Sequence, residues 1–214
     1  MPHKTFFLIA FICLLIITWP FSPGPNAQTS QTPMVKAEEP EPSFQKADEF
    51  FLKKDLKAAA SEIRKGAGFL KMKVNEASKD GKEGLKASVQ ELEQLARDVE
   101  KGAVTSEEKL KDAFARSYQA LANHHYLKAS ESWAKKKTKE TGEALTAAAL
   151  YLEQTARWSG RKLETGTADV VNYVRTVGGK LIKGTGYGVE EVSKGIKEIG
   201  RELSSLVKRT EPQK

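Results

Sequence analysis

The chain has almost no cysteine, and this excludes two kinds of chemistry. Among its 214 residues only Cys13 is a cysteine, and it lies inside an apolar run near the N-terminus. One cysteine cannot form a disulfide within the chain. Its apolar neighbours offer nothing that would activate a thiol as a nucleophile. We therefore expect neither an intrachain disulfide nor cysteine catalysis.

Proline and strand-like patterns are also missing from most of the chain. No proline occurs from Ser43 to Thr210, so that residue interrupts no helix there. No segment alternates apolar and polar residues with β-branched enrichment, and no Asn-Gly or Asp-Gly pair joins two such segments. The sequence therefore predicts an all-α protein, with a small antiparallel bundle of two helical hairpins over 43–160.

Long apolar runs are absent except at the N-terminus. Phe6–Ile17 is uninterrupted apolar sequence, and prolines follow from Pro20 onward. The run is short for a membrane-spanning helix and suits the hydrophobic region of a signal peptide. We expect residues 1–27 to be a signal peptide or, if uncleaved, an N-terminal membrane anchor. The rest of the chain would then be exported, either to a periplasm or to the outside.

Two short segments lack the apolar residues that a packed core requires. Residues 28–42 are polar and rich in proline and glutamate, and residues 209–214 are polar. Such segments bury too little apolar surface to offset the entropy of ordering. We expect a disordered linker at 28–42 and a disordered tail at 209–214.

Acidic residues are fewer than basic ones. There are 35 Lys and Arg against 28 Asp and Glu, so the formal net charge is +7. A basic protein favours acidic partners, such as an anionic membrane surface or an acidic protein face. The basic residues are interspersed with acidic ones at helical spacing, so we expect no specific nucleic-acid binding.

Apolar residues recur at helical spacing throughout the bundle segment. The spacing predicts five helices, over about 43–53, 56–79, 83–101 and 106–136 and from about 138 onward. Gly81 and Gly84 are expected to mark the break between the second and third helices. Thr105 or Ser106, with Glu108, fits a capping box at the start of the fourth helix.

Two parts of the chain that are 82 positions apart resemble each other. Residues 44–72 align without gaps with residues 126–154, and aromatic residues match at Phe44/Tyr126, Phe51/Trp133 and Phe69/Tyr151. Each copy predicts a helix, a basic turn and a second helix. Two such hairpins can pack their aromatic faces together. The copies lack the signature and the 34-residue spacing of tetratricopeptide repeats.

An eleven-residue recurrence runs through the C-terminal segment. Eleven residues make three turns at about 3.67 residues per turn, so the apolar columns stay on one side of a nearly straight helix. This predicts a long, glycine-interrupted amphipathic helix over 161–208, with a kink between Gly178 and Gly188. An unbroken apolar series from Leu145 to Leu181 would even allow one continuous helix there. The candidate interaction face consists of Val170, Val174, Leu181, Val192, Ile196, Leu203, Lys180, Lys183, Lys194, Lys197 and Arg201.

In its mixture of Val, Thr, Gly, Lys and Glu and in its period, this segment is similar to synucleins, exchangeable apolipoproteins and late-embryogenesis proteins. The similarity is one of composition and period, without a specific motif. It implies reversible binding to lipid surfaces. Alternatively, the apolar stripe packs on the bundle or pairs with itself as a coiled coil.

Residue patterns for catalysis, cofactors or metals are lacking. His124 and His125 are adjacent, whereas helical metal ligands are four residues apart and share a face. The Gly-rich stretch 178–188 has neither the phosphate-loop nor the dinucleotide spacing. We therefore expect packed histidines, no metal, no cofactor, no small-molecule substrate and no enzymatic activity.

These patterns together predict a non-enzymatic exported envelope protein that acts through helix-mediated surface interaction. In this hypothesis the candidate interaction face docks on an anionic membrane surface or on a second copy of the chain. The alternative is a helical-hairpin adaptor that binds a protein or peptide partner through the groove of the bundle.

Overall fold

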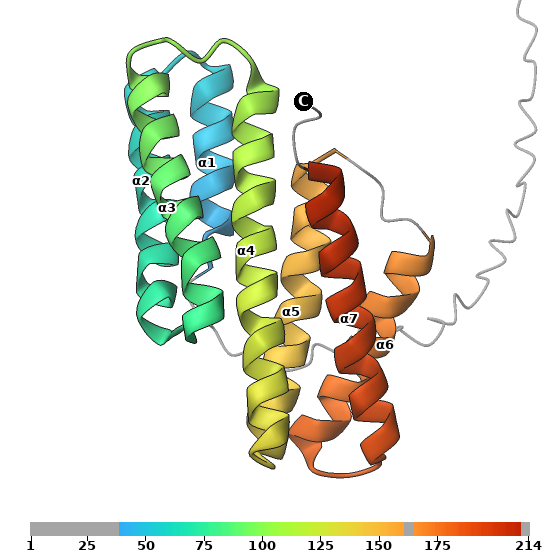
Figure 1. Ribbon diagram of the computed structural model, residues 1–214. Coiled ribbons are helices and arrows are strands. Elements are labelled where there is room, and N and C mark those ends of the chain that lie inside the picture. Colours follow the sequence, from blue (N-terminus) through green and yellow to red (C-terminus); the bar gives the residue numbers. More distant parts are fainter. Residues whose placement is uncertain (1–38, 161–164, 211–214) are drawn as a thin grey trace, which may run out of the picture. The chain divides into compact units, whose positions relative to one another are not determined.

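The computed structural model describes residues 39–160 and 165–210, and every regular element within these ranges is an α-helix (Figure 1). The predicted all-α fold is confirmed. The predicted signal or anchor segment 1–27 and most of the linker 28–42 lie outside the described residues, as do residues 211–214 of the tail. The helices are α1 (Glu41–Leu52), α2 (Leu56–Glu76), α3 (Lys79–Glu100), α4 (Glu107–Ala134), α5 (Thr138–Trp158), α6 (Thr165–Lys183) and α7 (Val189–Thr210).

Several helix ends differ from the predicted ones. Helix α1 begins at Glu41, so the end of the predicted linker is helical. The break between α2 and α3 falls at Ala77 and Ser78, not at the glycines. Gly81 lies inside α3, where a Cβ atom would be 3.5 Å from Nδ1 of His124. This glycine therefore allows close helix packing and does not end a helix. At α4 the predicted cap is present, because the Ser106 hydroxyl accepts a hydrogen bond from the backbone N–H of Glu108.

The continuous helix that the apolar series allowed from Leu145 to Leu181 is not formed. Helix α5 ends at Trp158, and Gly160 follows with a positive φ of 65°. The break expected between Gly178 and Gly188 is present after Lys183, but it reverses the chain instead of kinking it. Tyr173 of α6 donates a hydrogen bond to the carbonyl oxygen of Glu191, so α7 returns along α6. Folding back buries the apolar stripes of both helices against each other and the bundle.

The two hairpins that resemble each other in sequence have the same turn. Lys54 and Lys136, which are 82 positions apart, have positive φ angles of 63° and 58°. In each turn this lysine donates its N–H to the carbonyl three residues back, and the next residue donates to the carbonyl five residues back. This is the Schellman arrangement that ends a helix. The duplication is therefore visible in the backbone as well as in the sequence.

The structure extends the duplication beyond the two hairpins. Shifting the bounds of α2 by 82 positions gives the bounds of α5, and the same shift takes the start of α4 to the start of α7. The turns after α3 and α6 match as well, with Gly102 and Gly184 at φ angles of 70° and 72°. Apolar residues match without being identical at Leu92/Val174, Leu95/Val177, Val99/Leu181 and Leu110/Val192, all of them buried.

The chain is therefore a tandem of two repeats that share α4. The first repeat contains α1, α2, α3 and the first half of α4, and the second contains the last half of α4, α5, α6 and α7. Within each repeat the four helices pack in the same order, and the last contacts the first. Figure 1 shows α4 as the long helix with α1–α3 on one side and α5–α7 on the other.

An aromatic cluster joins the two repeats. The ring of Phe44 in α1 stacks on Phe114 in α4 with a centroid distance of 4.2 Å. Trp158 of α5 meets Phe114 edge-on at 5.0 Å. The Glu41 carboxylate accepts hydrogen bonds from the Tyr118 hydroxyl at 2.5 Å and from the Trp158 indole N–H at 3.0 Å. The C-terminal half of α5 is thus held in the groove between α1 and α4.

Candidate functional site

The apolar part of the candidate interaction face is covered by the chain itself. Val174, Leu181, Val192 and Leu203 are each exposed by 3% or less. Val170 and Ile196 are partly buried and pack against the same core. The structure therefore shows the packing alternative for this stripe, and these side chains are available to another surface only if α6 and α7 leave the bundle.

The basic part of that face behaves differently. Lys180 forms an ion pair with Glu191 at 2.5 Å and is partly buried. Lys183 is exposed on the last turn of α6. The remaining three cations, Lys194, Lys197 and Arg201, are exposed on α7. Residues three and four apart share one side of a helix, so these three form a basic ridge on the side opposite to the buried stripe.

A surface depression lies beside this ridge. It has a volume of about 480 Å³ and is lined by Tyr126, Lys197, Gly200, Arg201, Ser204 and Ser205. We call these six residues the terminal face, because they belong to the last repeat. Tyr126 lies against the backbone of α7, and a Cβ atom at Gly200 would be 2.9 Å from its ring. Gly200 therefore allows α4 and α7 to approach each other here. Lys197 and Arg201 belong to the candidate interaction face predicted from the sequence, and the other four residues were not predicted.

The same face of the first repeat is buried. The residues 82 positions before Lys197, Gly200, Arg201 and Ser204 are Ala115, Tyr118, Gln119 and Ala122, which are exposed by 9% or less. Helix α5 packs along α4 here, and its Tyr151 ring lies 6.0 Å from the ring of Tyr118. Equivalent faces are thus an internal interface in the first repeat and an open surface in the second. The sequence held a signal for this difference, because small or neutral residues in one copy align with cations in the other.

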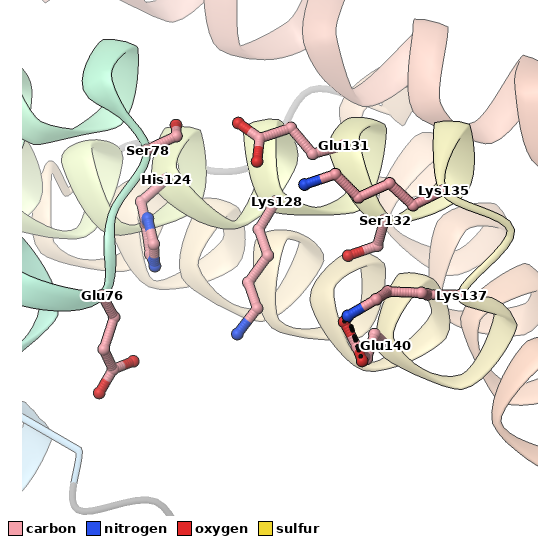
Figure 2. Close-up of a pocket in the computed structure, with 9 residues that line it drawn as sticks. All are labelled: Glu76, Ser78, His124, Lys128, Glu131, Ser132, Lys135, Lys137 and Glu140. Carbon is pink, nitrogen blue, oxygen red and sulfur yellow. Dashed lines mark hydrogen bonds and ion pairs between the residues drawn. The ribbon is translucent and has the colours of Figure 1, made fainter.

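A second cleft lies between the end of α2 and the C-terminal half of α4 (Figure 2). Its volume is about 170 Å³, and its charged lining residues are Glu76, Lys128, Glu131, Lys135, Lys137 and Glu140. Lys137 and Glu140 form an ion pair at 3.0 Å across one end. Acidic and basic groups balance in this cleft, whereas the charged groups of the terminal face are both basic. The cleft therefore offers weaker electrostatic selection of a ligand.

A buried histidine, His124, lines this cleft where the repeats meet, and the partly buried His125 lies next to it. His124 is 2% exposed, and neither of its ring nitrogens has a hydrogen-bond partner. The ring of His125 is 4.8 Å from His124 and 5.3 Å from Tyr151. Burial, reinforced by nearby charges such as Lys128, lowers the pKa of His124 to about 4. Burial and His124 lower the pKa of His125 to about 3. Both side chains are therefore neutral at pH 7.

Within residues 39–160 and 165–210, no three His, Cys, Asp or Glu side chains gather as a metal ion would require. In the same residues no helix has the length and apolar character needed to cross a bilayer.

Comparisons with protein-family models, with curated proteins and with solved structures gave no match. No relative therefore suggests a role for the terminal face or for the histidine cleft. What distinguishes the terminal face is its position, since its counterpart in the first repeat is occupied by a helix.

Proposed function

We propose that the protein is a non-enzymatic adaptor that binds a protein partner on the terminal face of its second repeat. The observation that carries this proposal is the difference between the repeats. The chain covers this face in the first repeat with α5, and leaves the equivalent face open in the second. Repeat proteins commonly bind partners on surfaces that the repeated scaffold leaves open.

The chemistry of the terminal face suits a protein partner. Tyr126 presents part of an aromatic ring, and Lys197 and Arg201 present positive charge at the edge of the depression. Tyrosine and arginine are enriched among the residues that dominate the binding energy of protein interfaces. The hydroxyl of Ser204 donates to the carbonyl oxygen of Gly200 within α7, so its oxygen can still accept a hydrogen bond from a partner.

Site-specific photocrosslinking in the source cells tests this proposal. A photoreactive phenylalanine analogue replaces Ser204 in the full chain, and a matched control carries it at Gln90, which is exposed on α3. We expect a discrete protein adduct from position 204 and none from position 90. Absence of a protein adduct at position 204, or the same adduct at both positions, contradicts the proposal.

We also propose that the protein acts outside the cytoplasm. The supporting observation is the apolar run Phe6–Ile17 and the proline-rich sequence after it. Cell fractionation and N-terminal sequencing of the purified protein test this. Export predicts the chain in the envelope or the medium, with either a new N-terminus near residue 28 or a retained anchor. A cytoplasmic chain that starts at Met1 would refute it.

An anionic membrane surface is the second candidate, and the basic ridge of α7 favours it. Each Lys or Arg close to an anionic bilayer contributes about 1 kcal/mol. Lys197 and Arg201, with a smaller contribution from Lys194 because it is ion-paired with Glu198 at 3.7 Å, therefore support a weak, salt-sensitive attachment. Because the apolar stripe is buried, it is not available to insert into the bilayer, and the attachment would be electrostatic. The test is co-sedimentation of the full chain with phosphatidylglycerol vesicles at low and high salt, with phosphatidylcholine vesicles as control. No binding at low salt eliminates this candidate.

A further inference from the structure

We infer that the terminal face receives an acidic amphipathic helix with an aromatic anchor, in the position that the C-terminal half of α5 takes against the first repeat. This inference rests on the proposed function, and it specifies the kind of partner. The filled face of the first repeat indicates what the open face of the second can bind.

The filled face shows how a helix is held there. Trp158 of α5 lies 5.0 Å from the ring of Phe114 and 6.4 Å from that of Phe44. Seven residues earlier in α5, the ring of Tyr151 lies 6.0 Å from the ring of Tyr118. Arg157 adds an ion pair to Glu41 at 3.1 Å. Helix α5 is therefore anchored by two aromatic side chains and by one charged contact at the edge of the groove.

The open face keeps this groove but lacks its filling. Tyr126 stands at the position of Phe44, Ile196 at that of Phe114 and Gly200 at that of Tyr118. Because Gly200 has no side chain, the Tyr126 ring lies directly against α7, and no aromatic side chain of α7 stands where α4 has Tyr118. The depression of about 480 Å³ lies at this point, with Tyr126 as one wall. An aromatic side chain of a partner can occupy it and pack against Tyr126.

The charges of the open face decide which helix fits. Ala115 and Gln119 are buried on α4, the helix along which α5 packs, and the residues at their positions in the second repeat are Lys197 and Arg201. A helix in the same place would cover these two cations. Covering a charge without a partner is strongly unfavourable, so the incoming helix must supply carboxylates. An acidic helix is thus selected, and a basic or neutral one is disfavoured.

These charges also exclude the simplest occupant, the same helix from a second copy. The C-terminal half of α5 carries Arg157, which would add a third cation near Lys197 and Arg201. In addition, Tyr151 and Trp158 are 4% and 7% exposed, so they are already committed within their own chain. A different protein is therefore the expected partner.

A designed peptide provides the first test. The probe is a stapled helix with the sequence of residues 145–158 in which Gln154 and Arg157 are replaced by glutamate, and binding to the full chain is followed by fluorescence anisotropy. We expect saturable binding that weakens about tenfold or more with the double variant Lys197→Glu and Arg201→Glu. The control variant Lys86→Glu, at an exposed site on α3, should bind like the parent chain. Replacing the tryptophan of the peptide by alanine should weaken binding to a similar degree.

Charge exchange makes this test stringent. A peptide with lysine at positions 154 and 157 should bind the Lys197→Glu, Arg201→Glu variant better than the parent chain, because the attractive pairs are restored. Lack of binding up to about 1 mM peptide, or binding that ignores both charge and tryptophan, overturns the inference.

Mapping the partner segment that crosslinks to position 204 provides the second test. A helix with carboxylates and an aromatic residue on one face supports the inference, and an extended segment, a basic helix or a lipid adduct contradicts it. A protein adduct with another kind of segment refutes the acidic helix but leaves the proposed function intact. The absence of any protein adduct refutes the proposed function.

Discussion

The two repeats share one scaffold and differ in what covers it. Their turns match in φ angle and hydrogen bonding, as the pairs Lys54/Lys136 and Gly102/Gly184 show. Their buried positions match in apolar character. At the last helix of each repeat, however, the outer face is uncharged and covered in the first repeat, and it is basic and open in the second. Backbone geometry is thus retained while one face has taken on a different chemistry.

This difference has a simple physical origin. In a stack of repeats, each repeat buries its face against the next, and the terminal one must present polar residues to water. The second repeat has no following repeat within the described residues, and Lys197 and Arg201 keep its outer face polar. A plain polar cap, however, would not need the depression that Gly200 leaves beside Tyr126. This depression is why we propose a binding role in addition to capping.

The largest expected difference between the repeats comes from removing equivalent aromatic rings. Phe44→Ala should lower the free energy of unfolding by about 3–5 kcal/mol, because the buried ring stacks on Phe114 and leaves a cavity. Tyr126→Ala should cost less than about half as much, since part of its ring already faces the depression. Urea unfolding of the two variants measures this. Equal losses would mean that the second groove is as closely packed as the first. If Phe44→Ala does not fold, Phe44→Leu serves the same comparison.

The second prediction concerns the pH dependence of stability, which should arise at the junction of the repeats, where His124 and His125 lie. The unfolded chain binds protons at both histidines below about pH 6.5, whereas folded His124 and His125 stay neutral down to about 4 and 3. Stability should therefore fall as the pH decreases from about 6.5 towards 4, by about 1.4 kcal/mol per histidine for each unit of pKa lowering.

The control for this pH prediction replaces each histidine by the type of residue found 82 positions later, which is leucine at 206 and valine at 207. The variant His124→Leu, His125→Val should lose most of this pH dependence, as measured by urea unfolding between pH 7 and 4. An unchanged slope in the variant would assign the acid effect to other groups. The next to examine are Glu100 and Glu191, because the hydrogen bonds from Arg64 and Lys180 lower the pKa values of these carboxyls.

A smaller change in stability, caused by alanine substitutions in α6, tests how closely α5 and α6 cross. Gly178 of α6 stands where α3 has Ala96, and a Cβ atom at Gly178 would lie 2.9 Å from the carbonyl oxygen of Gly142 in α5. Gly178→Ala should destabilise the protein by about 1–3 kcal/mol. The neighbouring Gly179 has no atom within 4 Å of such a Cβ, so Gly179→Ala should stabilise by about 0.5–1 kcal/mol. Thermal unfolding that shows the same sign for both would contradict the close crossing.

The smallest predicted change should be the same in both repeats. Lys54 and Lys136 adopt the left-handed conformation, which costs a non-glycine residue about 1–2 kcal/mol. Replacing either by glycine should stabilise the protein by up to about 1 kcal/mol after the entropy cost of glycine is subtracted. The matched control is Lys53→Gly, where φ is −76°, which should destabilise. A clear gain at one turn only would show that the two turns are not energetically equivalent.

Much of the local structure could be predicted from the sequence. The absence of proline and of strand patterns predicted helices, and the Ser106 cap and the first duplicated turn followed from residue types at fixed spacing. The duplication could be traced only through its first hairpin, because α3/α6 and α4/α7 retain apolar character with few identities. The terminal face was missed for the same reason, since Gly200 and Tyr126 gain meaning only when they are compared with Tyr118 and Phe44.

By itself, the sequence determined that the chain is helical, that it carries a repeated hairpin and that its C-terminal third has one apolar side, because these properties follow from the period of apolar residues and from local turn chemistry. The tertiary structure decided where that apolar side goes. A stripe such as Val174 to Leu203 can bury itself against a membrane, a second chain or its own bundle, and the local pattern is the same in each case. Only the reversal after Lys183, which brings α7 back onto α6 and α4, shows that the stripe is buried within the chain and that the basic side faces outward.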